Sequence, residues 1–161
     1  MKTRFFLTKK VLILALFVNI FLFALSQTKQ DIKDYLKTRI ELYSERPGTK
    51  VEFSSCGLKY YFNRTLFGNP PWTQEWSCSL SNLLDVLYIN DSGLIMITLK
   101  FRSKDISVTD IEQDGTRKFV MLDSDFSFFF PRGTINDDDA KKIVTLFKKL
   151  GKQCGAKVLE L

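Results

Sequence analysis

The strongest constraint on the fold is a run of alternating apolar and polar residues that fills much of the second half of the chain. Two hairpin turns interrupt this alternation, Asn-Asp-Ser-Gly at residues 90–93 and Asp-Gly at residues 114–115. A period of two places one face of a strand in a core and the other toward solvent. The predicted strands are residues 83–89, 95–101, 106–111, 118–122 and 126–130. Hairpins that follow one another in this way predict an antiparallel, meandering sheet.

Two amphipathic helices are predicted to flank this sheet. Apolar residues recur at a helical period in residues 29–45, after which Pro-Gly ends the segment. In residues 137–154, Asn136 can cap the helix, aspartates face its positive end and lysines gather toward its negative end. Strands at residues 51–53 and 58–62 bring the predicted total to about seven. The prediction is a single α+β domain over residues 27–161, with an N-terminal helix and a C-terminal amphipathic helix packed on the sheet.

Residues 1–26 have the three parts of a cleavable signal peptide. A stretch with four Lys and Arg residues precedes an apolar run at residues 11–25, and small residues suit cleavage before Gln27. The apolar run is shorter than the roughly 20 residues that a spanning helix needs, and Asn19 interrupts it. We therefore expect an exported protein, periplasmic or extracellular, with no membrane span after cleavage.

The net charge of +6 largely reflects this segment, which holds four of the 24 Lys and Arg residues and none of the 18 Asp and Glu residues. Removing it leaves 20 basic residues against 18 acidic ones, a net charge of +2. Nucleic-acid binding through counter-ion release needs many cations clustered on one face. A nucleic acid is therefore not an expected partner.

Three cysteines would enter an oxidising compartment, and an odd number cannot all pair within one chain. A disulfide between Cys56 and Cys78 is the expected pair, because it would close a loop rich in Gly, Pro and Trp. Cys154 continues the apolar stripe of the C-terminal helix and is expected to be a buried thiol. The alternative is that all three cysteines are unpaired.

The chain has no histidine, which excludes Ser-His-Asp and Cys-His catalysis and the usual imidazole metal sites. No nucleophile or phosphate-binding motif is present. Asp110, Glu112 and Asp114 resemble the start of a calcium loop, but Met121 stands where such a loop has its closing glutamate. We therefore expect no metal, no cofactor and no enzymatic activity.

Residues 64–81 lack clear alternation and are predicted to form a long loop. This segment holds both tryptophans, Trp72 and Trp76, together with Phe67 and two consecutive prolines. Indole rings on a loop stiffened by prolines can stack on a sugar or dock a partner's apolar side chain. The three aromatic residues are the predicted partner-binding residues. The alternative is a lid that folds down and completes the core.

The order of elements resembles the pleckstrin-homology-like architecture, in which meandering strands are closed by a final helix. The two hairpin turns and the helix at residues 137–154 carry this resemblance, which covers roughly residues 50–154. The chain also loosely resembles small exported domains whose Lys-rich terminal helix ends in a cysteine. The resemblance to the pleckstrin-homology-like architecture implies a scaffold for binding peptides or other ligands rather than for chemistry.

Three functional hypotheses follow from the sequence. The leading one is an exported, non-enzymatic binding or interaction module whose contact surface includes residues 66–81, with an unknown protein or a glycan as partner. The second is a carrier for a small apolar ligand. The residues expected to line its cavity include Ile97, Leu99, Phe119 and Phe128. The third is a hydrolase that uses carboxylates such as Asp110 and Asp114.

Overall fold

The protein is an α+β domain, as the sequence predicted. The computed structural model describes residues 28–66 and 70–159, and the predicted signal peptide, residues 1–26, lies outside the described residues. An N-terminal helix covers residues 28–43. The other elements, in chain order, are β1 (Lys50–Phe53), β2 (Gly57–Arg64), β3 (Trp72–Ser79), a 3-10 helix (Leu80–Asn82), β4 (Leu83–Asp91), β5 (Leu94–Phe101), β6 (Ile106–Ile111), β7 (Arg117–Asp123), β8 (Asp125–Phe130) and α2 (Asp137–Gln153).

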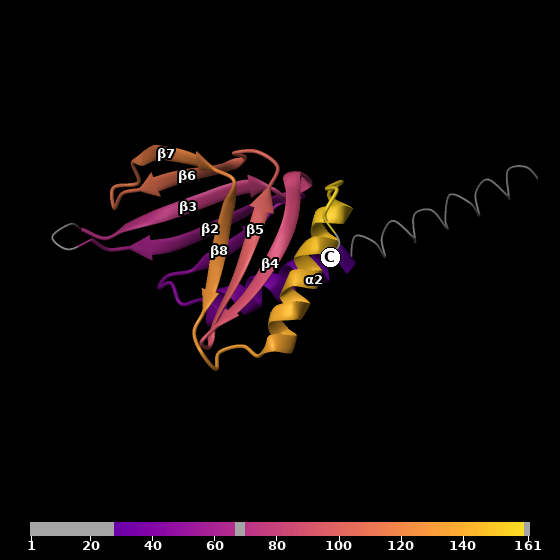
Figure 1. Cartoon of the computed structure of the whole chain (residues 1–161). Helices are drawn as coiled ribbons and strands as arrows, with labels where there is room; N and C mark the ends of the chain where they lie inside the picture. The colour runs from indigo at the N-terminus through magenta and orange to yellow at the C-terminus, as the bar shows by residue number, and fades with distance from the viewer. Residues whose placement is uncertain (1–27, 67–69, 160–161) are drawn as a thin grey trace, which may run out of the picture.

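The strands form two antiparallel sheets rather than one continuous meander (Figure 1). The larger sheet has five strands in the order β1-β2-β3-β6-β7, and the smaller has three in the order β4-β5-β8. The chain leaves the larger sheet after β3, builds the β4–β5 hairpin, returns for β6 and β7 and leaves again for β8. The predicted hairpins are therefore present, but consecutive hairpins alternate between the two sheets.

Strand β3 lies within the segment that was predicted to be a loop, and it raises the strand count from seven to eight. It pairs along its whole length with β2, from Gly57 opposite Ser79 to Arg64 opposite Trp72. The prediction failed because Gln74, a polar residue that is 3% exposed, lies between Trp72 and Trp76 on the same face of the strand. A polar residue at that position interrupts the apolar alternation on which a strand prediction depends.

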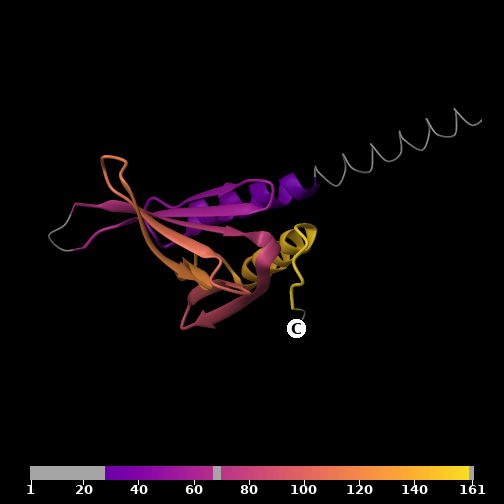
Figure 2. The ribbon, with the colours of Figure 1, turned by 90° about the horizontal axis from the view of Figure 1, so that it is seen from above.

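An aromatic core joins the two sheets and helix α2. The Tyr60 ring on β2 contacts Phe126 and Phe128 on β8, with centroids 5.9 and 5.0 Å apart. Phe128 in turn stacks on Phe147 of α2 at 5.7 Å. We call the face of the larger sheet that carries Tyr60 its inner face and the opposite face its outer face. The inner face is thus packed against the smaller sheet over the middle of the molecule (Figure 2).

Helix α2 begins and ends as its sequence predicts. The Asn136 side chain accepts a hydrogen bond from the Asp139 backbone N–H at 2.7 Å, which satisfies one free donor of the first turn. The chain leaves the helix through Gly155, whose φ of 86° suits glycine. Among the described residues, no helix is long and apolar enough to cross a membrane.

The disulfide joins Cys56 to Cys154, and Cys78 is a free, buried thiol. The expected pair of Cys56 with Cys78 was therefore wrong, as was the expectation of an unpaired Cys154. Strand register explains the difference, because the partner of Cys78 on β2 is Leu58. Cys56 lies in the turn before β2, where the C-terminal end of α2 reaches it with a Cα–Cα distance of 5.7 Å. Lys29 of the N-terminal helix donates a hydrogen bond to the Cys56 sulfur at 3.3 Å.

Candidate binding site

A pocket of about 450 Å³ lies between the ends of two hairpins of the larger sheet, β2–β3 and β6–β7. Both hairpin ends project from the body of the domain, away from helix α2 (Figures 1 and 2). The pocket opens on the inner face, beyond the part that the aromatic core occupies. Its lining residues are Pro70, Pro71, Trp72, Asp110, Glu112, Gln113, Asp114 and Lys118.

Of the three predicted aromatic residues, only Trp72 lines this pocket. It is partly exposed, it stands beside Pro70 and Pro71, and its indole nitrogen Nε1 is buried without a hydrogen-bond partner among the described residues. Trp76 shares its face of β3 but packs against Phe126, at a centroid distance of 5.8 Å. Phe67 lies outside the described residues. Both tryptophans belong to β3, so the predicted loop was wrong at these positions.

The rest of the pocket is predominantly acidic. Three carboxylates, those of Asp110, Glu112 and Asp114, face one ammonium group, that of Lys118, which forms an ion pair with Glu112. A hydrogen bond of 2.8 Å from the Thr116 backbone N–H lowers the pKa of Asp114 below its ordinary value. The Asp114 carboxyl therefore stays ionised to a lower pH than a free aspartate. A flat indole beside these anions suits a ligand that combines a cation with an apolar part.

Gln74 on β3 lies opposite Asp110 on β6 and fixes the position of its carboxylate with a hydrogen bond. Its Nε2 donates to Asp110 Oδ1 at 2.8 Å, and its Oε1 accepts hydrogen bonds from Trp76 Nε1 at 2.8 Å and from Arg64 Nη1 at 3.3 Å. Gln74 is 3% exposed, and both its amide nitrogen and its amide oxygen have hydrogen-bond partners. It connects the core-facing tryptophan to the pocket.

The structure also bears on the residues named in the two alternative hypotheses. Asp110 and Asp114 do line one pocket, but the lowered pKa of Asp114 makes it a poor proton donor. Among the described residues, no group of three or more Cys, Asp or Glu side chains is placed to hold a metal ion. Of the residues proposed for an apolar cavity, Ile97 and Phe128 are fully buried in the core while Phe119 is 64% exposed. Those residues therefore do not line a common cavity.

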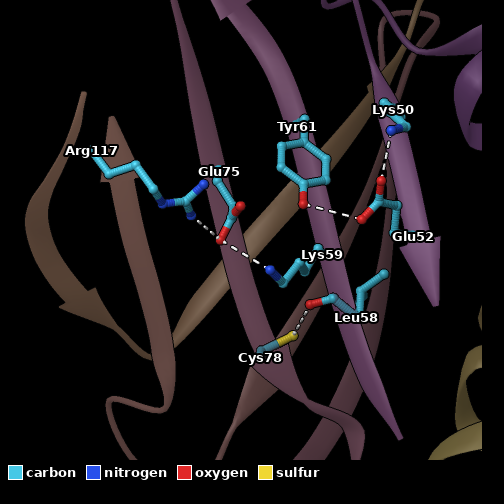
Figure 3. Close-up of polar contacts among 8 residues, drawn as sticks. All are labelled: Lys50, Glu52, Leu58, Lys59, Tyr61, Glu75, Cys78 and Arg117. Carbon is cyan, nitrogen blue, oxygen red and sulfur yellow. Dashed lines mark hydrogen bonds and ion pairs between the residues drawn. The ribbon is translucent and has the colours of Figure 1, made fainter. Parts of the chain in front are cut away.

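The outer face of the larger sheet carries a second polar cluster, centred on Glu75 (Figure 3). Glu75 Oε1 lies 2.8 Å from Arg117 Nη2 and 3.6 Å from Lys59 Nζ, whereas its Oε2 is buried without a hydrogen-bond partner in the described part of the chain. Burial acts to raise the pKa of Glu75, but Arg117 and Lys59 outweigh it and the net pKa is lowered. Next to it, Tyr61 donates to Glu52 at 3.2 Å, and burial together with the two carboxylates raises the tyrosine pKa.

This outer cluster connects strands of the larger sheet. Arg117 on β7 and Lys59 on β2 both reach the carboxylate on β3, so one buried anion ties three strands together. We assign it a structural role and take the acidic pocket on the inner face as the candidate site.

Gln74 and Lys118 were not predicted as site residues. A signal for Gln74 exists in the sequence, since it lies midway between two tryptophans and alternation places all three on one face. Lys118 enters the site only because β7 returns beside β6 with Lys118 opposite Asp110. The Asp-Gly turn predicted this hairpin, so the sequence did contain a signal that places Lys118 near Asp110.

The chain was compared with protein-family models, with curated proteins and with solved structures, and none of them matches it.

Proposed function

We propose that this chain is an exported, non-enzymatic binding module whose pocket receives a cationic side chain, Lys or Arg, of a partner polypeptide. The observation that carries the proposal is the composition of the pocket, in which an indole and two prolines stand beside three carboxylates and one lysine. An indole face attracts a cation electrostatically, and carboxylates add charge-assisted hydrogen bonds. A purely apolar ligand would desolvate these anions without offering them a new hydrogen-bond donor.

Export is supported by two independent features. The first is the signal-like composition of residues 1–26. The second is the disulfide between Cys56 and Cys154, since structural disulfides persist mainly in oxidising compartments. A partner met outside the cytoplasm therefore fits the proposal best.

The proposal is tested by NMR titration of ¹⁵N-labelled protein with N-acetyl-arginine amide. N-acetyl-norleucine amide, a neutral side chain of similar length, is the control ligand. The arginine compound should shift the Trp72 indole N–H signal and the backbone amides between Asp110 and Lys118, because the ligand would sit against these groups. Equal shifts with the neutral compound, or no shifts at these positions, would contradict the proposal.

Two variants sharpen the assignment to the pocket. Trp72→Ala and Asp114→Asn should each weaken the arginine-dependent shifts, because one removes the indole face and the other a charge. Asp91→Asn is the matched control, because Asp91 is also an exposed aspartate at a hairpin turn but lies on the β4–β5 hairpin. Loss of binding in Asp91→Asn to the same degree as in Asp114→Asn would indicate nonspecific attraction to acidic surface.

A further inference from the structure

Strand β7 is an edge strand with an unusual amount of exposed apolar surface. It is the last strand of the larger sheet, and the four consecutive residues Phe119, Val120, Met121 and Leu122 are 64%, 45%, 43% and 50% exposed. Edge strands present unpaired backbone N–H and C=O groups, and proteins usually protect such edges with charges, covering segments or very short strands. In β7 the middle of the strand is apolar.

The other three sheet edges in the described residues are covered. On β1, the Val51 backbone N–H donates to the Glu41 carboxylate of the N-terminal helix at 2.7 Å. On β4, the Leu84 carbonyl accepts from the Leu159 N–H at 2.9 Å, and on β8 the Phe129 carbonyl accepts from the Glu45 N–H at 2.8 Å. Within the described part of the chain, the backbone of β7 is hydrogen-bonded to the backbone of β6 alone. The free edge of β7 therefore stands out from the rest of the architecture.

A β-bulge at Val120 determines which β7 side chains share a face. Phe119 pairs with Thr109 and Leu122 with Ser107, so both belong to the outer face although their positions differ by three. Lys118 pairs with Asp110 and Asp123 with Ile106, so both belong to the inner face. In a strand without a bulge, residues three or five positions apart would lie on opposite faces.

This arrangement makes β7 self-complementary in an antiparallel pairing. When two copies of β7 run side by side around a two-fold axis between Val120 and Met121, Phe119 of each copy lies opposite Leu122 of the other on the outer face. In the same register, Lys118 of each copy lies opposite Asp123 of the other on the inner face. One register thus forms both apolar and opposite-charge cross-strand pairs, the pairs that stabilise sheets.

We infer that the protein forms a homodimer through β7, in which the two larger sheets join into one continuous antiparallel sheet. A two-fold pairing of this kind uses the same surface on both copies, as most protein dimers do. The charge pattern of β7, with Arg117 and Lys118 at its start and Asp123 at its end, favours a second copy of the same strand in antiparallel orientation. Lys118 forms its present ion pair with Glu112 through a side chain that is 63% exposed, so it can also reach a second partner.

Sedimentation-equilibrium centrifugation over a concentration series tests this inference on the purified protein, with its N-terminus defined by mass spectrometry. The wild type should approach twice the monomer mass as concentration rises. Phe119→Lys combined with Leu122→Lys should stay monomeric, because lysines would oppose each other across the axis. Leu42→Lys is the control, because Leu42 is an exposed residue of the N-terminal helix at 65% and its replacement should leave the dimer intact.

Charge reversal tests the register. Lys118→Asp and Asp123→Lys should each raise the dimer dissociation constant by roughly tenfold, since each places like charges opposite each other twice per dimer. The double variant should restore the wild-type constant, a result that general destabilisation would not produce. Circular dichroism should show that the variants are folded. A wild type that remains monomeric at every concentration, or a dimer that survives Phe119→Lys with Leu122→Lys, would overturn the inference. A double variant without recovery would overturn the register.

Discussion

Cys56 and Cys154 are joined by a disulfide although they are 98 residues apart in the sequence. The bond links the β1–β2 turn of the larger sheet to the end of helix α2, which packs on β4 and β5 of the smaller sheet. The disulfide therefore connects an early segment of the domain, the β1–β2 turn, to its last helix, α2.

Cys154→Ala should lower the free energy of unfolding by about 4 to 5 kcal/mol, the loss of unfolded-chain entropy expected for a loop of about 100 residues. Cys56→Ala should cost a similar amount, and the double variant little more, because each single change already opens the bond. Urea denaturation of oxidised protein measures this effect. Wild type treated with a reductant should match the variants. Equal stability of reduced and oxidised wild type would contradict the expected contribution.

Cys78 should not react with iodoacetamide in the folded protein. Burial raises the pKa of its thiol, so little reactive thiolate is present at mildly alkaline pH, and its sulfur also lies 3.8 Å from the Leu58 carbonyl inside the sheet. Mass spectrometry should find no alkylated cysteine before denaturation and one alkylated cysteine after denaturation without reductant. Rapid labelling of native protein would show that β2 and β3 open more readily than their pairing indicates.

Stability should fall on acidification in a way that depends on Glu75. Its folded-state pKa lies below that of an unfolded glutamate, so its stabilising contribution is fully present above the unfolded pKa and is lost as the pH falls through the folded pKa. Glu75→Gln should lower stability at neutral pH and flatten this acid dependence, as measured by urea denaturation over a pH series. Glu45→Gln removes an exposed carboxylate and should leave the profile nearly unchanged. Parallel profiles for wild type and Glu75→Gln would contradict the role assigned to the outer cluster.

Gln74→Leu should lower the free energy of unfolding by roughly 1 to 3 kcal/mol, because the Trp76 indole N–H and the Asp110 carboxylate would each lose a partner. Tryptophan fluorescence during urea denaturation measures the change. Thr73→Val, at the adjacent position on the opposite face of β3, is the control and should cost less, because its hydroxyl hydrogen bond to Asn63 is exposed. A Gln74→Leu variant as stable as wild type would show that the amide is dispensable.

Local patterns in the sequence predicted both helices and every strand except β3, but not the way the sheets are assembled. The Asp-Gly turn at Gly115, with φ of 85°, and the Asn136 cap depend on neighbouring residues alone, so both could be recognised. The pairing of β3 with β6 could not, because alternation tells which face a side chain occupies and not which strand lies beside it.

The same limit applies to the candidate site. Trp72 was predicted for its ring, and Asp110 and Asp114 were singled out as carboxylates. They line one pocket only because the register of β3 and β6 places Gln74 opposite Asp110. The disulfide was mispredicted for a related reason, since the end of α2 approaches Cys56 through packing of distant segments rather than through any sequence spacing.

The alternation of the chain between the two sheets also shapes how the protein reaches its native state. The larger sheet is complete only when β6 pairs with β3, and β4 and β5 lie between these two strands in the sequence. The smaller sheet likewise requires β8, which follows β6 and β7. Non-local pairings of this kind slow folding, because the chain must lose conformational entropy before the stabilising contacts between distant strands can form. We therefore expect no fragment of the chain to fold by itself, and the domain to appear in one late, cooperative step.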